Sequence, residues 1–511
     1  MERTKNAVRN IRGGIIEKIL TIILGFATRT VLIKVLGSEY LGLNSLFSSI
    51  LQVLNFAELG FGSAIVFSMY KPVANNDKKT ICALMNLYKK VYRIVGFVIA
   101  VIGLAIVPFL GNIIKGTPPS DINIYVLYLI YLFGTVSSYW LFAYKNVLIN
   151  AHQRNDIYSN LNSIVNIIKS VVQIIFVVLA KNYYLFVIMI PIASVISNII
   201  CAMIVDKKYP EYKPEGKLSK EEIKDIKKRV YGLMTQKICG TTRNSFDSIF
   251  LSAFNGLSTV GIYNNYYSIM SYVQVFLSII TSSITASVGN SIATESVEKN
   301  YNDMMKFNFM YMWISGWCTV CMLCLYQPFV RIWMGTDYMF PFYIVIFLCI
   351  YFYMLRAGDI RYTYMSAAGI WWEGKYKYVI ETILNIILNY FLGKYFGVGG
   401  IILATVISLF IVNFLLITGI LYKNYFKGYS QKEFFINHLI YALTTVISCA
   451  VTYYCCTLIP IEGIIGILIK AVICCIVPNI IYVIFYRKNK NYDATIAFVK
   501  NIVKSRANIG R

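Results

Sequence analysis

Long apolar stretches recur along almost the whole chain, and short polar or charged segments separate them. Most stretches contain roughly 18 residues or more, the length that an α-helix needs to cross the hydrocarbon core of a bilayer. The pattern therefore predicts an all-α polytopic membrane protein with about fourteen transmembrane helices. The predicted spans are 12–36, 40–69, 93–114, 123–149, 157–180, 183–205, 230–254, 258–288, 307–334, 340–365, 372–396, 398–422, 435–459 and 463–486.

Composition supports a membrane protein. Of the 511 residues, 58% are hydrophobic and 14% are charged, more apolar surface than a soluble domain can hide from water. Most of the twelve cysteines lie inside apolar runs. Cys318, Cys321 and Cys324 have the spacing C-x-x-C-x-x-C in mid-span, but the sequence places no other ligand beside them. We expect these thiols to pack as small apolar groups, and we expect no metal or cofactor.

The positive charges are distributed unevenly between the two ends of the spans. A net charge of +24 would suggest nucleic acid for a soluble protein, but 37 of the 48 Lys and Arg residues fall on the side of the N-terminus. The opposite side carries only Lys115, Lys181 and Lys394. By the positive-inside rule both termini face the cytoplasm, which requires an even number of spans. We therefore expect lipid headgroups, and no nucleic acid, as the partners of the basic segments.

The spans and polar segments divide the chain into five parts. An N-lobe (1–205, spans 1 to 6) precedes a cytoplasmic linker (206–229), and a C-lobe (230–422) contains spans 7 to 12. Two further spans (423–486) and a basic cytoplasmic tail (487–511) complete the chain. In the linker, Ser219 and Glu222 have the spacing of a capping box, which predicts a short interfacial helix.

The two lobes resemble one another when the chain is shifted by 219 residues. Glu17-Lys18-Ile19 then aligns with Gln236-Lys237-Ile238, and Leu41-Gly42-Leu43 aligns with Val260-Gly261-Ile262. Six spans separate the copies, so the repeats have the same orientation in the membrane. Parallel repeats of this kind are a transporter architecture, with the cargo site between the lobes.

Polar side chains recur inside several spans, where an ionisable group costs at least about 2.5–3.5 kcal/mol unless it faces the bundle interior. Lys18 and Arg29 are eleven residues apart, about three helical turns, and share a face. Asn162, Asn166 and Lys169 also form one stripe. The candidate substrate-binding residues are Lys18, Arg29, Gln52, Asn55, Asn162, Asn166, Lys169, Lys237, Arg243 and Gln274, and the candidate coupling carboxylates are Glu58, Asp247 and Glu381.

Two interpretations of these residues stay open. Single Ser, Thr and Asn side chains can serve as hydrogen-bonding contacts between helices. Arg243 and Asp247, four residues apart, can form an ion pair that locks a lobe or can belong to a binding site. Several cations that converge without local carboxylates would repel one another unless an anion binds between them, and this favours a site for an anionic substrate.

Two segments resemble a known family. LGSEYLGL at 36–43 and AELGFGSA at 57–64 are similar to the start of Wzx-type polysaccharide-transport flippases of the multidrug/oligosaccharidyl-lipid/polysaccharide (MOP) superfamily. The resemblance implies a V-shaped, MATE-like pair of six-helix lobes plus two C-terminal helices. It also implies a bacterial inner-membrane flippase for an undecaprenyl-diphosphate-linked oligosaccharide, such as an O-antigen, lipopolysaccharide, capsule or exopolysaccharide unit. Lys18, Arg29 and Lys237 match the basic positions of the superfamily. The resemblance also implies H+ or Na+ as a coupling ion and the polysaccharide polymerase machinery as a protein partner.

Three other functions fit the sequence less well. A MATE-type drug/cation exporter would need a cavity dominated by carboxylates, whereas these spans are net basic. A membrane polysaccharide polymerase or glycosyltransferase would need a large external loop or a carboxylate–metal site, and neither is visible. With only His152 and His438 and no nucleophile–base arrangement, we predict that the protein is not an enzyme. A purely structural role in polymer assembly is disfavoured by the cations inside the spans.

Overall fold

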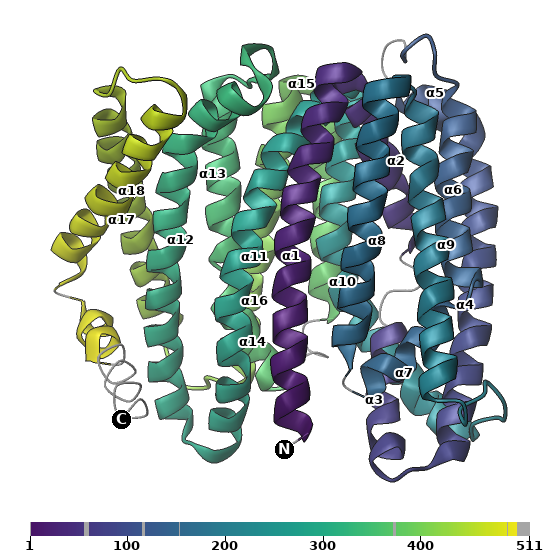
Figure 1. Ribbon diagram of the computed structural model, residues 1–511. Helices are drawn as coiled ribbons and strands as arrows, with labels where there is room; N and C mark the ends of the chain where they lie inside the picture. Colours follow the sequence, from purple (N-terminus) through teal and green to yellow (C-terminus); the bar gives the residue numbers. More distant parts are fainter. Residues whose placement is uncertain are drawn as a thin grey trace. The chain divides into compact units, whose positions relative to one another are not determined.

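The computed structural model describes residues 2–55, 61–114, 118–152, 154–370, 375–487 and 489–497. These residues form helices and short connections, without any β-strand. The chain divides into two compact units, Met1–Asn264 and Asn265–Arg511, and each is described by itself (Figure 1). The division falls inside one helix, so the lobe boundaries at 205 and 230 stay a prediction.

Unit 1 is a bundle in which α1 packs against α8 and α2, while α6 packs against α9 and α4. Helix α10 packs against α2 and α3 in the same unit. Its helices are α1 (Glu2–Val35), α2 (Ser38–Leu54), α3 (Phe61–Ala74), α4 (Lys78–Ile106), α5 (Leu110–Ile113), α6 (Ile124–Trp140), α7 (Asn146–Ala151), α8 (Asn155–Ile175), α9 (Tyr183–Lys208), α10 (Lys220–Asn255) and the first turns of α11 (Leu257–Thr294).

Side-chain caps fix where several of these helices begin. Asn123 and Asn182 accept hydrogen bonds from the first free backbone N–H groups of α6 and α9. The predicted capping box is present, with Ser219 and Glu222 bonded reciprocally. The helix that it starts does not end in the linker, because no proline follows to stop it. It continues as α10 to Asn255, so the separate interfacial helix that we predicted is the first part of a longer helix.

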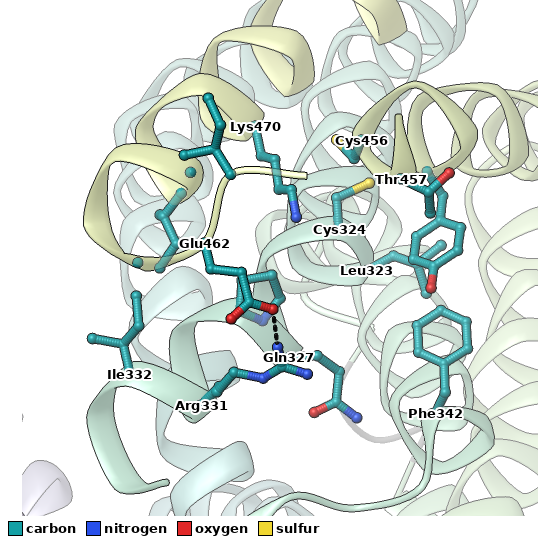
Figure 2. Close-up of a pocket in the computed structure, with 16 residues that line it drawn as sticks. Leu323, Cys324, Gln327, Arg331, Ile332, Phe342, Cys456, Thr457, Glu462 and Lys470 are labelled. Carbon is teal, nitrogen blue, oxygen red and sulfur yellow. Dashed lines mark hydrogen bonds and ion pairs between the residues drawn. The ribbon is translucent and has the colours of Figure 1, made fainter. Parts of the chain in front are cut away.

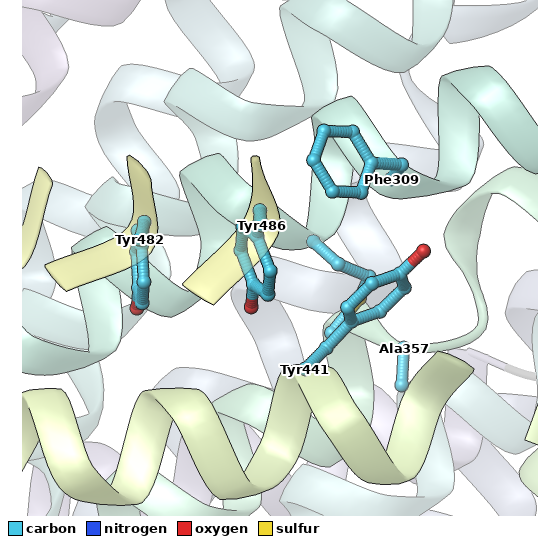
Figure 3. Packing of buried hydrophobic residues seen from close by; sticks show 6 residues of the cluster. Phe309, Ala357, Tyr441, Tyr482 and Tyr486 are labelled. Carbon is cyan, nitrogen blue, oxygen red and sulfur yellow. The ribbon is translucent and has the colours of Figure 1, made fainter. Parts of the chain in front are cut away.

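Unit 2 is built around α12 (Val297–Met334), which packs against α13, α14, α17 and α18. Phe309 of α12 contacts Tyr441 of α17 and Tyr486 of α18, with ring centroids 5.7 and 5.2 Å apart (Figure 3). These aromatic contacts attach the last two helices to α12. The other helices are α13 (Phe342–Arg356), α14 (Asp359–Ala367), α15 (Lys375–Ser408), α16 (Ile417–Asn424), α17 (Gln431–Thr457) and α18 (Gly463–Tyr486), with a π-helical segment, Leu409–Leu416, between α15 and α16.

The number of spans is only partly supported. Among the described residues, eight helices are long and apolar enough to cross a membrane, or nine if the bent pair α6 and α7 is one span. All fourteen predicted stretches fall on helices, but fourteen crossings are not confirmed. The predicted span 40–69 is divided into α2 and α3. The predicted spans 372–396 and 398–422 meet at Gly397, whose φ of 55° breaks the helical conformation inside α15.

The outer faces of the long helices are apolar. On α18, the side chains of Ile464, Ile465 and Leu468 are each at least 60% exposed in the chain by itself. Such a continuous apolar surface is unusual for a soluble protein and suits contact with lipid tails. The all-helical fold and these surfaces confirm the predicted fold class of a multi-pass membrane protein.

Candidate anion-binding site in unit 1

Helices α1 and α8 lie side by side, and each contributes a cation that was predicted from the sequence. Arg29 of α1 is half-buried and donates a hydrogen bond to the backbone carbonyl of Asn264, at 3.3 Å. Lys169 of α8 is half-buried and donates to the side-chain amide oxygen of Asn166, at 2.9 Å. The acceptors in these two hydrogen bonds are neutral oxygens.

The amide stripe on α8 is a real structural feature. Asn162, one turn before Asn166, accepts a hydrogen bond from Ser197 of α9 at 2.9 Å. Gln173, one turn beyond Lys169, donates to the carbonyl of Phe186 at 2.9 Å. Two members of the stripe therefore bond to α9, as expected for contacts between helices, while Asn166 bonds to Lys169.

Helices α2 and α10 contribute a second polar pair. Gln52 accepts a hydrogen bond from Ser245 at 3.2 Å, and Asn55 accepts one from Tyr139 at 3.1 Å. On α10, Arg243 is buried, and Asp247 is fully buried and accepts a hydrogen bond from Tyr263 at 3.3 Å. Buried groups of opposite charge at this spacing fit both an ion pair and a binding site.

The structure brings eight of the predicted residues into unit 1: Arg29, Gln52, Asn55, Asn162, Asn166, Lys169, Arg243 and Asp247. Gln274, half-buried on α11, and Glu381, buried on α15, belong to unit 2. Glu58 and the side chains of Lys18 and Lys237 lie outside the described part of the structure. The roles of all these residues stay predictions.

Sequence reasoning missed a set of buried cations in unit 2. Arg356, Arg361 and Lys377 were counted as cytoplasmic loop charges, but all three side chains are buried. Arg356 forms an ion pair with Asp359 at 2.8 Å, and Tyr311 donates to the same carboxylate. The ammonium of Lys377 lies 4.4 Å from the ring centroid of Tyr378. Their burial was not predicted from the sequence, and the orientation of the chain in the membrane stays a prediction.

Arg361 has a specific structural partner. Its guanidinium donates to the backbone carbonyls of Asn413 at 3.1 Å and Phe414 at 2.8 Å, both in the π-helical segment. A π-helix displaces carbonyls from regular helical bonds, and this arginine satisfies two of them. The sequence indicated this contact only weakly, by an arginine that is followed about fifty residues later by an unbroken apolar run.

The polar groups of unit 1 suit an anion that carries hydroxyl groups. Arg and Lys are the natural partners of phosphate oxygens, and a low-dielectric surrounding strengthens their attraction. Carboxamides and tyrosine hydroxyls offer donors and acceptors to sugars. The fold defines a multi-pass membrane protein.

Comparison with known proteins identifies the family. Residues 7–286 match the family described as polysaccharide biosynthesis protein, so the chain belongs to that family. No curated protein sequence matches the chain.

Several solved structures share the fold. A structure of the lipid II flippase MurJ, in an inward closed conformation, superposes with a TM-score of 0.67 at 18% identity, over 93% of this chain and 99% of that chain. An inward-facing multidrug resistance MATE transporter of the MOP superfamily gives 0.61 at 14% identity, over 78% of this chain and 95% of that chain. A MOP superfamily transporter from Pyrococcus furiosus, described as having a binding pocket of reverse polarity, gives 0.51 at 14% identity, over 81% and 96%.

These comparisons confirm the predicted family, that of polysaccharide biosynthesis proteins, and the predicted fold, which this chain shares with MurJ and with a MATE transporter of the MOP superfamily. At 14–18% identity, the structural likeness defines the fold and not the cargo.

Proposed function

We propose that this protein moves an undecaprenyl-diphosphate-linked oligosaccharide from the cytoplasmic to the outer leaflet of a bacterial inner membrane. The cargo would be a repeat unit of a surface polysaccharide such as an O-antigen, capsule or exopolysaccharide. Family membership supports a role in polysaccharide biosynthesis, and the MurJ-like fold supports transport of a large lipid-linked substrate.

One observation carries the proposal beyond the family. Arg29 and Lys169 lie on α1 and α8, two helices that pack together. Two like charges on adjacent helices repel one another, and a diphosphate between or beside them would relieve that repulsion. The surrounding amides would bind the first sugars. Lys18 and Lys237, which align in the internal repeat, extend the same basic set in the sequence.

The same observation separates this proposal from drug or cation export, for which the MATE likeness is the argument. An organic cation would be repelled by the basic residues of unit 1. Alternating access would expose the site first to the cytoplasm and then to the outer side. Asp247 and Glu381, both buried, are the described carboxylates that would take up H+ or Na+ if transport is coupled to an ion.

The test is carried out in the bacterium that carries the gene. Arg29→Ala and Lys169→Ala should each lower the amount of surface glycan about tenfold or more, because each loses a charge-assisted contact worth about 1.5–3 kcal/mol. Lipid extracts analysed by mass spectrometry should show the undecaprenyl-diphosphate-linked precursor accumulating. Lys34→Ala removes an exposed cation from the same helix α1 and serves as the matched control.

A second measurement examines binding directly. The purified protein should bind undecaprenyl diphosphate more tightly than undecaprenyl monophosphate in native mass spectrometry, and added salt should weaken this preference. Normal glycan export in both variants, at normal protein levels in the membrane, would refute the proposed site. Equal binding of the two lipids by the wild type would refute recognition of the diphosphate.

A further inference from the structure

Three buried cysteines from three helices of unit 2 meet at one point. Cys324 of α12, Cys456 of α17 and Cys474 of α18 have their Sγ atoms within 4.8 Å of one another. All three are free thiols, and each side chain is at most 3% exposed. The sequence showed only the first of these residues as part of a possible motif. The additional ligands come from segments more than one hundred residues away.

A pocket leads to this cysteine cluster. It has a volume of about 180 Å³ and is lined by the ends of α12 and α17, the turn that joins α17 to α18, and the first turns of α18. Cys324 and Cys456 both line it, and the Lys470 side chain extends into it toward Cys324 (Figure 2). Arg331 and Glu462 form an ion pair of 2.6 Å in the same pocket. An ion that enters by this turn would therefore reach two of the three sulfur atoms directly.

We propose that Cys324, Cys456 and Cys474 form a three-thiolate binding site for Cu(I). Thiolates are soft ligands that select Cu(I), whereas a structural Zn²⁺ site requires four ligands in a tetrahedron. A metal–sulfur bond of about 2.3 Å places three ligands around a planar ion roughly 4 Å apart, so small side-chain movements would complete the site. Cys321, one turn before Cys324, packs against this cluster and its thiol lies 4.0 Å from the backbone carbonyl of Cys474, but it is not one of the three residues whose sulfur atoms all lie within 4.8 Å of one another.

The charge of the bound state is partly balanced. Each thiol that becomes a ligand releases its proton to water in the pocket, and copper stays in the +1 state throughout. Three thiolates around one Cu(I) carry a net charge of −2. Lys470 lies one helical turn before Cys474 on α18, and its ammonium offsets part of that charge. The bound ion would join α12 to α17 and α18, the last two helices of the chain.

This site goes beyond the proposed transport function and does not depend on it, because none of its residues belongs to the set in unit 1. The experiment uses the full-length protein, purified in detergent under anaerobic, reducing conditions. Cu(I) is titrated in competition with the chromophoric chelator bathocuproine disulfonate. We expect the wild type to withhold one Cu(I) per chain from the chelator. X-ray absorption of the loaded protein should show three sulfur neighbours.

Cys474→Ser should raise the Kd for Cu(I) by more than the roughly 100-fold that loss of an outer-sphere partner causes, because a direct ligand is removed. Cys475→Ser, which changes the neighbouring cysteine on an exposed face of α18, is the matched control and should bind as the wild type does. Equal binding by the two variants would overturn the proposal. So would a wild type that withholds no Cu(I), or an absorption spectrum with fewer than three sulfurs, and these two results do not depend on the folding of a variant.

Discussion

Gly42 and Gly261 contact each other's helices reciprocally, and they are the residues that the 219-residue repeat aligns. A methyl group added at Gly42 would overlap the carbonyl oxygen of Leu257, which opens α11. A methyl group added at Gly261 would lie 2.5 Å from the carbonyl oxygen of Ser38, which opens α2. Ser38 and Leu257 are also 219 residues apart. Each glycine therefore contacts the first residue of the other helix, as expected if a two-fold axis relates the beginnings of α2 and α11. This symmetry supports the internal repeat.

The close approach makes a stability prediction. Gly42→Ala and Gly261→Ala should each destabilise the protein by about 1–3 kcal/mol, because backbone atoms must move apart to admit the methyl group. The double variant should lose less than the sum of the two, since the first methyl group already separates the helices. Thermal unfolding in detergent measures all three changes.

Gly289→Ala is the matched control for this pair. Gly289 lies on the same helix α11, but nothing is within 4 Å of an added methyl group there. Alanine has the higher helix propensity, so this variant should be as stable as the wild type or slightly more stable. Fully additive losses in the double variant would contradict a shared contact between Gly42 and Gly261.

The hydrogen bond between Lys169 and Asn166 gives a prediction about transport. Asn166→Asp keeps the shape of the side chain but places a negative charge 2.9 Å from the ammonium. An internal ion pair would then compete with the substrate's diphosphate for Lys169. We expect stability to be unchanged or higher and surface glycan to fall several-fold.

Asn162→Asp tests whether the effect is specific to the neighbour of Lys169. Asn162 is one turn further along the same stripe and bonds to Ser197 instead. Glycan export should be reduced less in this variant than in Asn166→Asp. If both aspartates lower export equally, then a general loss of polar contacts, and not neutralisation of Lys169, is responsible.

Arg361 should be essential for stability although it is remote from the proposed anion site. Arg361→Met fills a similar volume but removes the arginine donor from the carbonyls of Asn413 and Phe414. The Phe414 carbonyl keeps the hydroxyl of Thr418, whereas an unsatisfied buried acceptor at Asn413 costs about 1–3 kcal/mol. We expect a clear loss of thermal stability. Arg361→Lys should have an intermediate stability, because one ammonium can replace Nη1 beside Asn413 and Phe414 but not also Nη2, which donates to the carbonyl of Ala357.

The matched control is Arg487→Met, which removes an exposed arginine after α18. It should unfold at the same temperature as the wild type. Wild-type stability in Arg361→Met would show that the π-helical segment does not need this donor.

These examples show which features the sequence could predict. The capping box at Ser219 and the stripe on α8 depend on residues three to seven positions apart, so helical geometry alone reveals them. The partner carbonyls of Arg361 and the meeting of Cys324 with Cys474 depend on tertiary packing between distant segments. From the sequence, Arg361 is interpreted as a charged loop residue because it lies between two apolar runs. No neighbouring residue indicates that it will donate hydrogen bonds to a π-helical segment.

The number of spans is not confirmed for a related physical reason. Helices rich in polar residues, such as α10, contain too many charged and polar residues to pass as apolar spans by composition. The two predicted spans 372–396 and 398–422 are joined directly at Gly397, whose positive φ interrupts the helix without a polar loop. Hydropathy therefore locates the helices, while the number of membrane crossings depends on how polar helices are sheltered by their neighbours.

Two hypotheses for Arg243 and Asp247 can be distinguished by mutation. The two residues either only stabilise the fold or also take part in transport. Asp247→Asn should lower both stability and glycan export, because it leaves the buried Arg243 without the carboxylate one turn away. Arg243→Gln/Asp247→Asn removes both charges and should restore thermal stability. If the pair belongs to the transport site, the double variant should be stable and correctly inserted but unable to export glycan. A stable double variant with normal export would assign the pair a purely structural role, so stability and export must be measured on the same preparations.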